Sequence, residues 1–386
     1  MFTIFVILLF GGAVLGSLLK NVPKPVMFDV KIDQQHPEKV LRAFEDFISK
    51  FGRSYETPEE KSRRLQHFAT KHNTIQILQQ NASSFGLNVT FGFNHFADWS
   101  RTEFEGMLSQ VPPVDFDEDV PDFEKVFNST RSKRSSLPEN FDLREATIGG
   151  ARLIGPVKNQ GSCGCCWAFA ATALTEVVYT LKNAEHKTLS DQEICDCGIV
   201  GKTPGCVGGD PHNGLRYASQ LGQTAQTAYP YVDGRANKTG ICRLRKTKRY
   251  LKAKLFDTTN IKKKGAEKSI MEHLVDNNIP VAVYFRVGDD FENYESGILE
   301  STGCDKMSTK IWHSGAIVGY GTSYRSNGKA VNYWILRNSW DYDWGENGYI
   351  RVLRGKNWCD IESNPVTAIL KKTSEREDYS SQDSSE

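Results

Sequence analysis

Cysteine is absent from the first 162 residues, although nine cysteines lie between Cys163 and Cys359. Neither sign of charge dominates: 48 Lys and Arg residues face 47 Asp and Glu residues, and the two kinds are interspersed. Nothing in this charge balance argues for a nucleic-acid partner, so we expect none. Beyond the N-terminus no stretch approaches the roughly 20 apolar residues of a membrane-spanning helix. There is no internal repeat, and the composition is that of a globular protein.

The N-terminus carries the one long apolar run. Residues 1–16, MFTIFVILLFGGAVLG, end in small residues and are predicted to be a signal peptide, with an uncleaved anchor as the alternative. Four sequons fit a secretory route, and their acceptors are Asn81, Asn88, Asn128 and Asn237. We therefore expect a protein of the secretory pathway, lysosomal or extracellular, where disulfides form. Because nine is an odd number, at least one thiol is left over.

Residues 38–82 are predicted to be helical, because their apolar residues recur at spacings of three and four. An acidic, proline-containing stretch follows at 112–124. Next comes a polar segment with a basic cluster, a candidate processing site formed by Arg131, Lys133 and Arg134. Basic clusters are also common on solvated surfaces, so both interpretations stay open. The polar tail at 373–386 is predicted to be disordered.

From Leu137 onward glycine and cysteine become frequent. The segment WAFAATALTEVVYTL is apolar nearly all round and predicts a buried helix. Ser190, with Glu193 three residues later, predicts a capping box at the start of a shorter helix. After about residue 245 short apolar runs alternate with glycines and predict strands. A helical half followed by a β-rich half indicates an α+β fold with two packed lobes and a cleft between them.

Three cysteines crowd into GSCGCCWAFA, residues 161–170, directly at the start of the buried helix. They could be metal ligands, disulfide partners or a nucleophile. Cys166 would lie in the first helical turn, where the helix dipole favours a thiolate. His313 could donate a proton, Asn338 could hold its ring, and the side chain of Gln160 could donate to an oxyanion. This set predicts acyl transfer to a cysteine.

Four motifs resemble those of papain-like cysteine proteases, the cathepsin L group in particular: PVKNQGSCGCCWAFA, GCVGG, HSGAIVGYG and NSWDYDWGENGYIRV. The resemblance extends upstream to the family's prodomain, through Glu60, Arg64, Phe68 and Ile75 and through Gly92, Asn94, Phe96 and Asp98. Lys71 and Gln79 depart from it, because the family has asparagine at both positions. Altogether the resemblance covers residues from about 38 to 370.

The resemblance implies a preproenzyme with a papain-like two-lobe peptidase domain. Its parts would be the signal peptide at 1–16, an inhibitory propeptide at 17–134, the peptidase domain at 135–372 and the tail. The propeptide would occupy the cleft until it is cleaved. The mature protein would be a monomeric endopeptidase that acts on proteins and peptides without a cofactor or metal. The alternatives are a non-catalytic papain-fold binding protein and a prodomain that inhibits other proteases.

The resemblance also assigns roles around the cysteine. Cys166 would attack the scissile carbonyl, and His313, oriented by Asn338, would transfer protons. Gln160 and the Cys166 N–H would hold the oxyanion, and Trp340 would shield the His–Asn hydrogen bond. Substrate-binding positions are implied at Gly208, Gly209, Asp210, Pro211, Tyr284, Ile311, Ser314, Trp340 and Asn364. Tyr284 and Asn364 differ from cathepsin L and predict a smaller, more polar S2 pocket. Trp312 and Asp341 also depart from the family pattern.

Three disulfides are implied by the same resemblance: Cys163–Cys206, Cys197–Cys242 and Cys304–Cys359. Two cysteines besides the nucleophile remain, Cys165 and Cys195. We predict that they form a fourth disulfide between the catalytic helix and the next helix; the alternative is two buried thiols. A zinc site formed by two Cys-x-Cys pairs would require the loss of two expected disulfides, so it is disfavoured.

Overall fold

The computed structural model describes residues 37–113, 136–198, 205–232, 234, 239–243, 248–261, 264–306 and 311–371. Several predicted features lie outside these residues: the signal peptide, the basic processing cluster, the polar tail and the sequons at Asn128 and Asn237. Asn81 and Asn88, the other two sequon asparagines, are exposed. Among the described helices, none has both the length and the apolar character to cross a membrane.

The N-terminal segment, residues 37–113, contains the two helices that the apolar spacing predicts. They are followed by a short strand and a third helix, and the four elements are α1 (Pro37–Phe51), α2 (Pro58–Ser84), β1 (Val89–Phe91) and α3 (Arg101–Gly106). Helix α2 begins where the Thr57 side chain accepts a hydrogen bond from the Glu60 N–H. Helices α1 and α2 pack through aromatic rings: the centroid of Phe68 lies 5.3 Å from that of Phe44. This segment therefore has a small core of its own.

The helical lobe is built around a helix that is buried on every side. Its elements are β3 (Thr147–Ile148), β4 (Ala151–Arg152), α5 (Cys166–Asn183), α6 (Asp191–Cys197), η1 (Gly205–Val207), α7 (Pro211–Leu221), β5 (Gln223–Thr224) and β6 (Arg249–Leu251). Every residue of α5 from Cys166 to Thr180 is buried, as its composition predicts. The predicted capping box of α6 is only half present. Ser190 accepts from the Glu193 N–H, but the Glu193 carboxylate bonds Tyr217 and Thr224 instead.

The β-rich lobe is a mostly antiparallel sheet in the order β1-β9-β12-β11-β10-β8-β13-β7, with β2 also paired to β10. Its own strands are β2 (Phe141–Asp142), β7 (Phe256–Asn260), β8 (Val281–Arg286), β9 (Tyr294–Leu299), β10 (Trp312–Tyr324), β11 (Ala330–Arg337), β12 (Tyr349–Leu353) and β13 (Val366–Leu370). Four short helices complete the lobe: α8 (Ala266–Asn277), α9 (Asp289–Glu292), η3 (Gly303–Lys306) and η4 (Trp358–Asp360). The fold is therefore α+β with a helical and a β-rich lobe.

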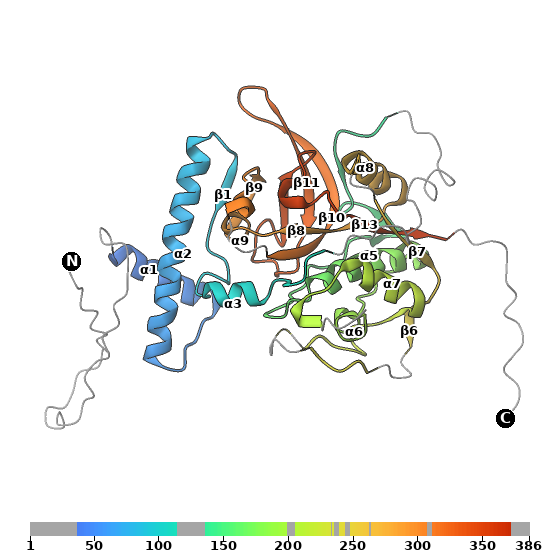
Figure 1. Cartoon of the computed structure of the whole chain (residues 1–386), viewed down its shortest axis with the longest axis horizontal. Helices are drawn as coiled ribbons and strands as arrows, with labels where there is room; N and C mark the ends of the chain where they lie inside the picture. The colour runs from blue at the N-terminus through green and yellow to red at the C-terminus, as the bar shows by residue number, and fades with distance from the viewer. Residues whose placement is uncertain are drawn as a thin grey trace, which may run out of the picture.

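The N-terminal segment is attached to the β-rich lobe by backbone pairing. Strand β1 pairs antiparallel with β9, so that Val89 lies opposite Gly297. In Figure 1 the long helix α2 runs beside β1 and β9, while α5, α6 and α7 gather on the other side of the strands. The chain that follows α3 leads from the N-terminal segment toward the junction of the two lobes (Figure 1). This route brings residues after α3 to the place where the predicted site residues meet.

Candidate active site

Cys166 is the first residue of α5 and is completely buried. Its sulfur receives a hydrogen bond from the backbone N–H of Ser314, the residue that follows His313 on β10. The start of the buried helix therefore lies directly against the start of β10, on the opposite lobe. Burial raises the pKa of the Cys166 thiol to about 12, although hydrogen bonds from Ser314 and Trp167 lower it.

His313 is also completely buried, and its ring nitrogen Nε2 lies 2.7 Å from Oδ1 of Asn338. The Ser339 N–H donates to the same Oδ1 at 2.8 Å, so this oxygen is an acceptor and Nε2 carries the proton. Nδ1 of His313 has no hydrogen-bond partner among the described residues. Burial lowers the pKa of His313 to about 4, while the Asn338 hydrogen bond raises it. The imidazole is therefore neutral, with Nδ1 available as an acceptor.

In the zymogen, burial opposes the predicted ionisation of Cys166. The helix dipole favours a thiolate at the tip of α5, but dehydration of the sulfur outweighs it, and the pKa of Cys166 goes up instead of down. Both members of the pair are thus neutral, a thiol and an imidazole.

Trp340 covers the His313–Asn338 pair, as the sequence predicts. Its ring centroid lies 4.7 Å from the ring of His313, and the side chain is fully buried. Phe96 and Phe104 of the N-terminal segment pack against Trp340 edge-on, at 5.2 and 5.5 Å. The hydrogen bond between histidine and asparagine is consequently kept from water partly by side chains of the N-terminal segment.

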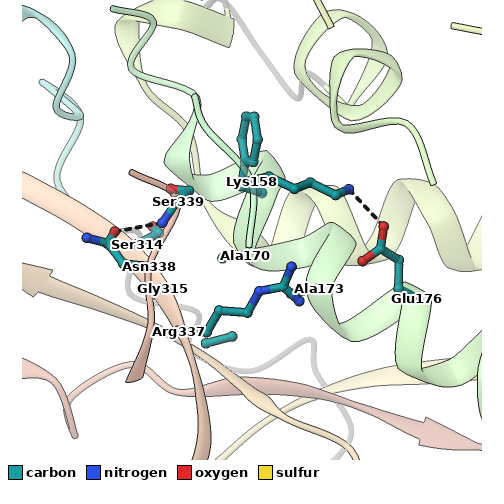
Figure 2. A pocket seen from close by; sticks show the side chains of 11 residues that line it. Lys158, Ala170, Ala173, Glu176, Ser314, Gly315, Arg337, Asn338 and Ser339 are labelled. Atoms are coloured by element: carbon teal, nitrogen blue, oxygen red, sulfur yellow. Dashed lines mark hydrogen bonds and ion pairs between the residues drawn. The ribbon is translucent and has the colours of Figure 1, made fainter. Parts of the chain in front are cut away.

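A pocket lies between the lobes just behind these residues. Ala170, Ala173 and Glu176 reach it from α5, whereas Ser314, Arg337 and Asn338 reach it from β10 and from the end of β11 (Figure 2). On one side of this pocket Lys158 forms an ion pair with Glu176 at 2.8 Å (Figure 2). The pocket shows that the two lobes meet along the same face of α5 that carries Cys166.

Gln160 is fully buried, and each of its polar groups has a defined partner. Its backbone N–H donates to the carbonyl of Ser339 at 2.9 Å, and its Oε1 accepts from the Ser339 hydroxyl at 2.7 Å. Its Nε2 donates to the carbonyls of Cys163 and Met107, each at 2.9 Å. Met107 belongs to the N-terminal segment, so a carbonyl from that segment takes the position that the sequence analysis assigns to an oxyanion.

The inter-lobe segment, residues 107–111, is held by both lobes. Ser109 and Trp312 bond each other's backbone in both directions, at 2.8 and 3.2 Å, and the Gln110 N–H donates to the Val207 carbonyl at 3.0 Å. The Tyr284 hydroxyl donates to the Val111 carbonyl at 2.7 Å and also bonds the Ser109 hydroxyl. The segment therefore passes between β8 and β10 on one side and the 207–208 turn on the other.

The predicted substrate-binding residues fall into three groups. Gly208 and Tyr284 enclose Ser109: a Cβ at Gly208 would lie 2.2 Å from the serine Oγ, and Tyr284 bonds that oxygen. The second group, Gly209, Asp210 and Pro211, has structural contacts instead. Gly209 lies against the Trp167 ring, and Asp210 caps α7, whose first residue is Pro211. In the third group, Ile311 and Ser314 are buried beside Trp312 and His313, and Asn364 is half-buried.

The three implied disulfides are confirmed: Cys163–Cys206, Cys197–Cys242 and Cys304–Cys359. The predicted bridge between Cys165 and Cys195 is wrong, because both residues carry thiols. Cys165 points to the Tyr231 hydroxyl, at 3.1 Å. The Cys195 sulfur instead faces the Cys163–Cys206 disulfide, and the three sulfurs lie within 4.8 Å of one another. The two side chains point to different neighbours, which a pairing count cannot reveal.

Residue types alone did not identify the charged contact between α2 and the β-rich lobe. Nζ of Lys71 lies 2.5 Å from Oε1 of Glu292 on α9, and the two side chains are 14% and 1% exposed. Arg101 lies 4.0 Å from the second oxygen of Glu292. The signal that could have found this contact is the departure at Lys71, a cation where the family has asparagine.

Two family comparisons agree with this geometry. The papain family cysteine protease domain matches residues 137–369, and the cathepsin propeptide inhibitor domain (I29) matches residues 44–104. The chain belongs to the papain family of cysteine proteases. It is a cysteine endopeptidase made as a zymogen with an inhibitory propeptide, and a papain-fold binding protein without catalysis is not favoured.

Relatives of this papain-family chain span nearly its whole described length. It is 30% identical over 334 residues to pro-cathepsin H of Medicago truncatula, covering 84% of this chain and 86% of that protein. It is 32% identical over 334 residues to the thiol protease aleurain of Arabidopsis thaliana, covering 84% of each. Among solved structures, procathepsin L2 from the larval midgut of Tenebrio molitor is similar with a TM-score of 0.70 and 28% identity, over 86% of this chain and 100% of that one.

Proposed function

We propose that Cys166, His313, Asn338 and Gln160 form the catalytic site of this endopeptidase. The observation that carries the proposal is the bond from the Gln160 side-chain amide to the carbonyl of Met107, at 2.9 Å. It supports an oxyanion site whose side-chain donor is already bonded to a peptide carbonyl. The His313–Asn338 hydrogen bond supplies the oriented base that a thiol nucleophile needs.

The reaction follows from the proton positions. His313 Nδ1 accepts the thiol proton of Cys166, and the thiolate attacks the carbonyl carbon of the scissile bond. Gln160 Nε2–H and the Cys166 N–H stabilise the negative oxygen, and the imidazolium gives its proton to the leaving amine. The resulting thioester is hydrolysed by a water molecule that loses its proton to His313. Asn338 keeps Nε2 protonated throughout, so Nδ1 is the nitrogen that exchanges protons.

The inter-lobe segment keeps the zymogen inactive by occupying this site. Bonds to Gln160 and Trp312 fix its Met107 and Ser109 in place. We assign the propeptide to residues 17–134 and the peptidase domain to 135–372, with cleavage at the basic cluster or by self-processing. The complete catalytic set lies in one chain, which supports a monomer. Exposed Asn81 and Asn88 and three disulfides support a lysosomal or extracellular destination.

The test is hydrolysis of a fluorogenic peptide by the full chain after processing. Cys166→Ala should abolish turnover, whereas Cys195→Ala, a buried thiol away from the site, should keep it. A peptidyl epoxide should label wild type and Cys195→Ala at one cysteine and leave Cys166→Ala unlabelled. Appreciable turnover by Cys166→Ala would falsify the assignment.

The substrate side chain in the S2 pocket should be small and polar. Ser109 already fits between Gly208 and Tyr284, where a Cβ on the glycine would clash with the serine oxygen. Trp312 stacks on Tyr284 with 5.6 Å between ring centroids, and this holds the tyrosine ring in place. In a P2 library we expect Ser, Thr and Ala to exceed Phe. A clear preference for Phe would show that the pocket opens beyond what Ser109 fills.

A further inference from the structure

Tyr231 lies where the chain around Cys166 meets the chain around Gln160. Its hydroxyl donates to the backbone carbonyl of Gln160 at 2.6 Å. The Cys165 sulfur lies 3.1 Å from the Tyr231 hydroxyl oxygen. Because the tyrosine proton is used toward Gln160, the phenolic oxygen accepts the Cys165 S–H proton. A continuous hydrogen-bonded chain thus runs from Cys165 through Tyr231 to Gln160.

The ring of Tyr231 is anchored on the catalytic helix as well. It meets the ring of Phe169 edge-on, with 4.9 Å between centroids, and Phe169 lies one turn after Cys166 on α5. The loop that carries Tyr231 is fixed at its other end, because the N–H and hydroxyl of Ser162 both donate to the Gly234 carbonyl at 3.0 Å. Gly161, with φ of +59°, has no room for a Cβ against that carbonyl. Tyr231 therefore has little freedom to move its hydroxyl.

From this geometry we propose that Tyr231 and Cys165 are positioning residues for the oxyanion site; the inference rests on the function proposed above. The two oxyanion donors come from different places, the side chain of Gln160 and the backbone N–H of Cys166. Tyr231 bonds the backbone carbonyl of Gln160, whose side chain is the first donor. It also bonds the side chain of Cys165, which precedes Cys166 and its N–H, the second donor. It fixes the distance between the donors, and Cys165 has a role that needs a hydrogen-bond donor, not a disulfide partner.

Loss of an oxyanion donor costs roughly 10²–10³-fold in kcat. Loss of a residue that only aligns the donors should cost less, and we expect Tyr231→Phe to lower kcat about 10-fold with KM unchanged. Cys165→Ala should lower kcat about 3-fold, and Cys165→Ser, which keeps a donor, should restore most of it. In Tyr231→Phe/Cys165→Ala the two losses should not multiply, because both act through one hydroxyl.

The experiment uses the full chain, processed and titrated with a peptidyl epoxide so that rates refer to active sites. Tyr229→Phe is the matched control: it removes a hydroxyl two residues away that bonds Asp196 at 2.7 Å instead of the catalytic residues. A peptide aldehyde, which forms a tetrahedral adduct with the nucleophile, should bind Tyr231→Phe more weakly by the same factor as kcat falls. A purely structural role would change stability but leave the aldehyde affinity per active site unchanged.

The outcomes separate the two claims. If wild type neither reacts with the epoxide nor turns over peptide, the proposed function fails. If wild type is active and Tyr231→Phe matches Tyr229→Phe in kcat and aldehyde affinity, the positioning role is refuted. If Cys165→Ser behaves like Cys165→Ala, the part assigned to Cys165 is wrong.

Discussion

The Lys71–Glu292 ion pair should decide how firmly the N-terminal segment stays docked. The pair joins α2 to α9 at 2.5 Å, and Glu292 is only 1% exposed. Lys71→Met keeps most of the side-chain volume and removes the charge. The variant can dock only by leaving a buried carboxylate without its main counter-ion, or by protonating it.

The magnitude follows from the surroundings of Glu292. Removing one partner of a buried ion pair costs about 3–5 kcal/mol. Arg101 lies 4.0 Å from the other carboxylate oxygen and still compensates part of the negative charge of Glu292 when Lys71 is removed. Lys71 is itself 14% exposed. We therefore expect a cost at or below the lower end of this range, about 2–3 kcal/mol, which is roughly a 30- to 150-fold larger undocked population. Burial already raises the pKa of Glu292, and without Lys71 it rises further, so the effect should shrink in acid as the carboxyl takes up a proton.

The assay is the rate at which a peptidyl epoxide labels Cys166 in the unprocessed full chain, since only the undocked population reacts. Lys61→Met is the control, because Lys61 pairs with Glu45 inside the N-terminal segment, where Glu45 is 59% exposed. The control should label at the wild-type rate, and Lys71→Met/Glu292→Gln should recover much of the latency. Equal labelling of Lys71→Met and Lys61→Met at neutral pH would refute the reasoning.

Three further changes test other parts of the structure. Burial acts to raise the pKa of Glu103, but hydrogen bonds from Arg64 and Ser100 hold it below the ordinary 4.5. The stability this pair contributes is therefore present at neutral pH and lost as the pH falls below 4.5, so Glu103→Gln should flatten the pH dependence of labelling in that range. Asp341 has φ of +67°, so Asp341→Gly should be nearly neutral in thermal unfolding and Asp341→Val should destabilise by about 1–2 kcal/mol. Trp340→Ala should cost about 3–5 kcal/mol of stability and most of the activity, measured by denaturant unfolding and peptide hydrolysis.

Local patterns in the sequence predict the elements well because their causes are local. The apolar spacing of residues 38–82 and the all-round apolar character after Cys166 each reflect which faces a helix buries, and α1, α2 and α5 follow. The Ser190 cap is likewise local, and it forms. The second half of that capping box fails because the Glu193 carboxylate finds partners on α7 and β5, which no spacing rule contains.

The sulfur chemistry shows where sequence reasoning stops. Three disulfides follow from family resemblance, but the direction in which Cys165 and Cys195 point depends on how α5, α6 and the loop at Tyr231 are packed. A count of the cysteines that remain after the three disulfides can suggest a bridge between Cys165 and Cys195, but it cannot test that bridge. The contact of Cys165 with Tyr231 gives that thiol a hydrogen-bonding role that a pairing argument does not consider.

The ionisation of Cys166 has the same origin in long-range packing. The sequence gives the helix tip and a histidine, and both favour a thiolate. It does not reveal how completely tertiary packing buries both side chains, which raises the pKa of Cys166 to about 12 and lowers that of His313 to about 4. The N-terminal segment adds a separate block, because its Met107 carbonyl accepts the hydrogen bond of the Gln160 side chain. Departure of residues 107–111 would free the Gln160 side chain and the backbone of Trp312 together, so a single movement would open the oxyanion site and the adjoining strand to a substrate.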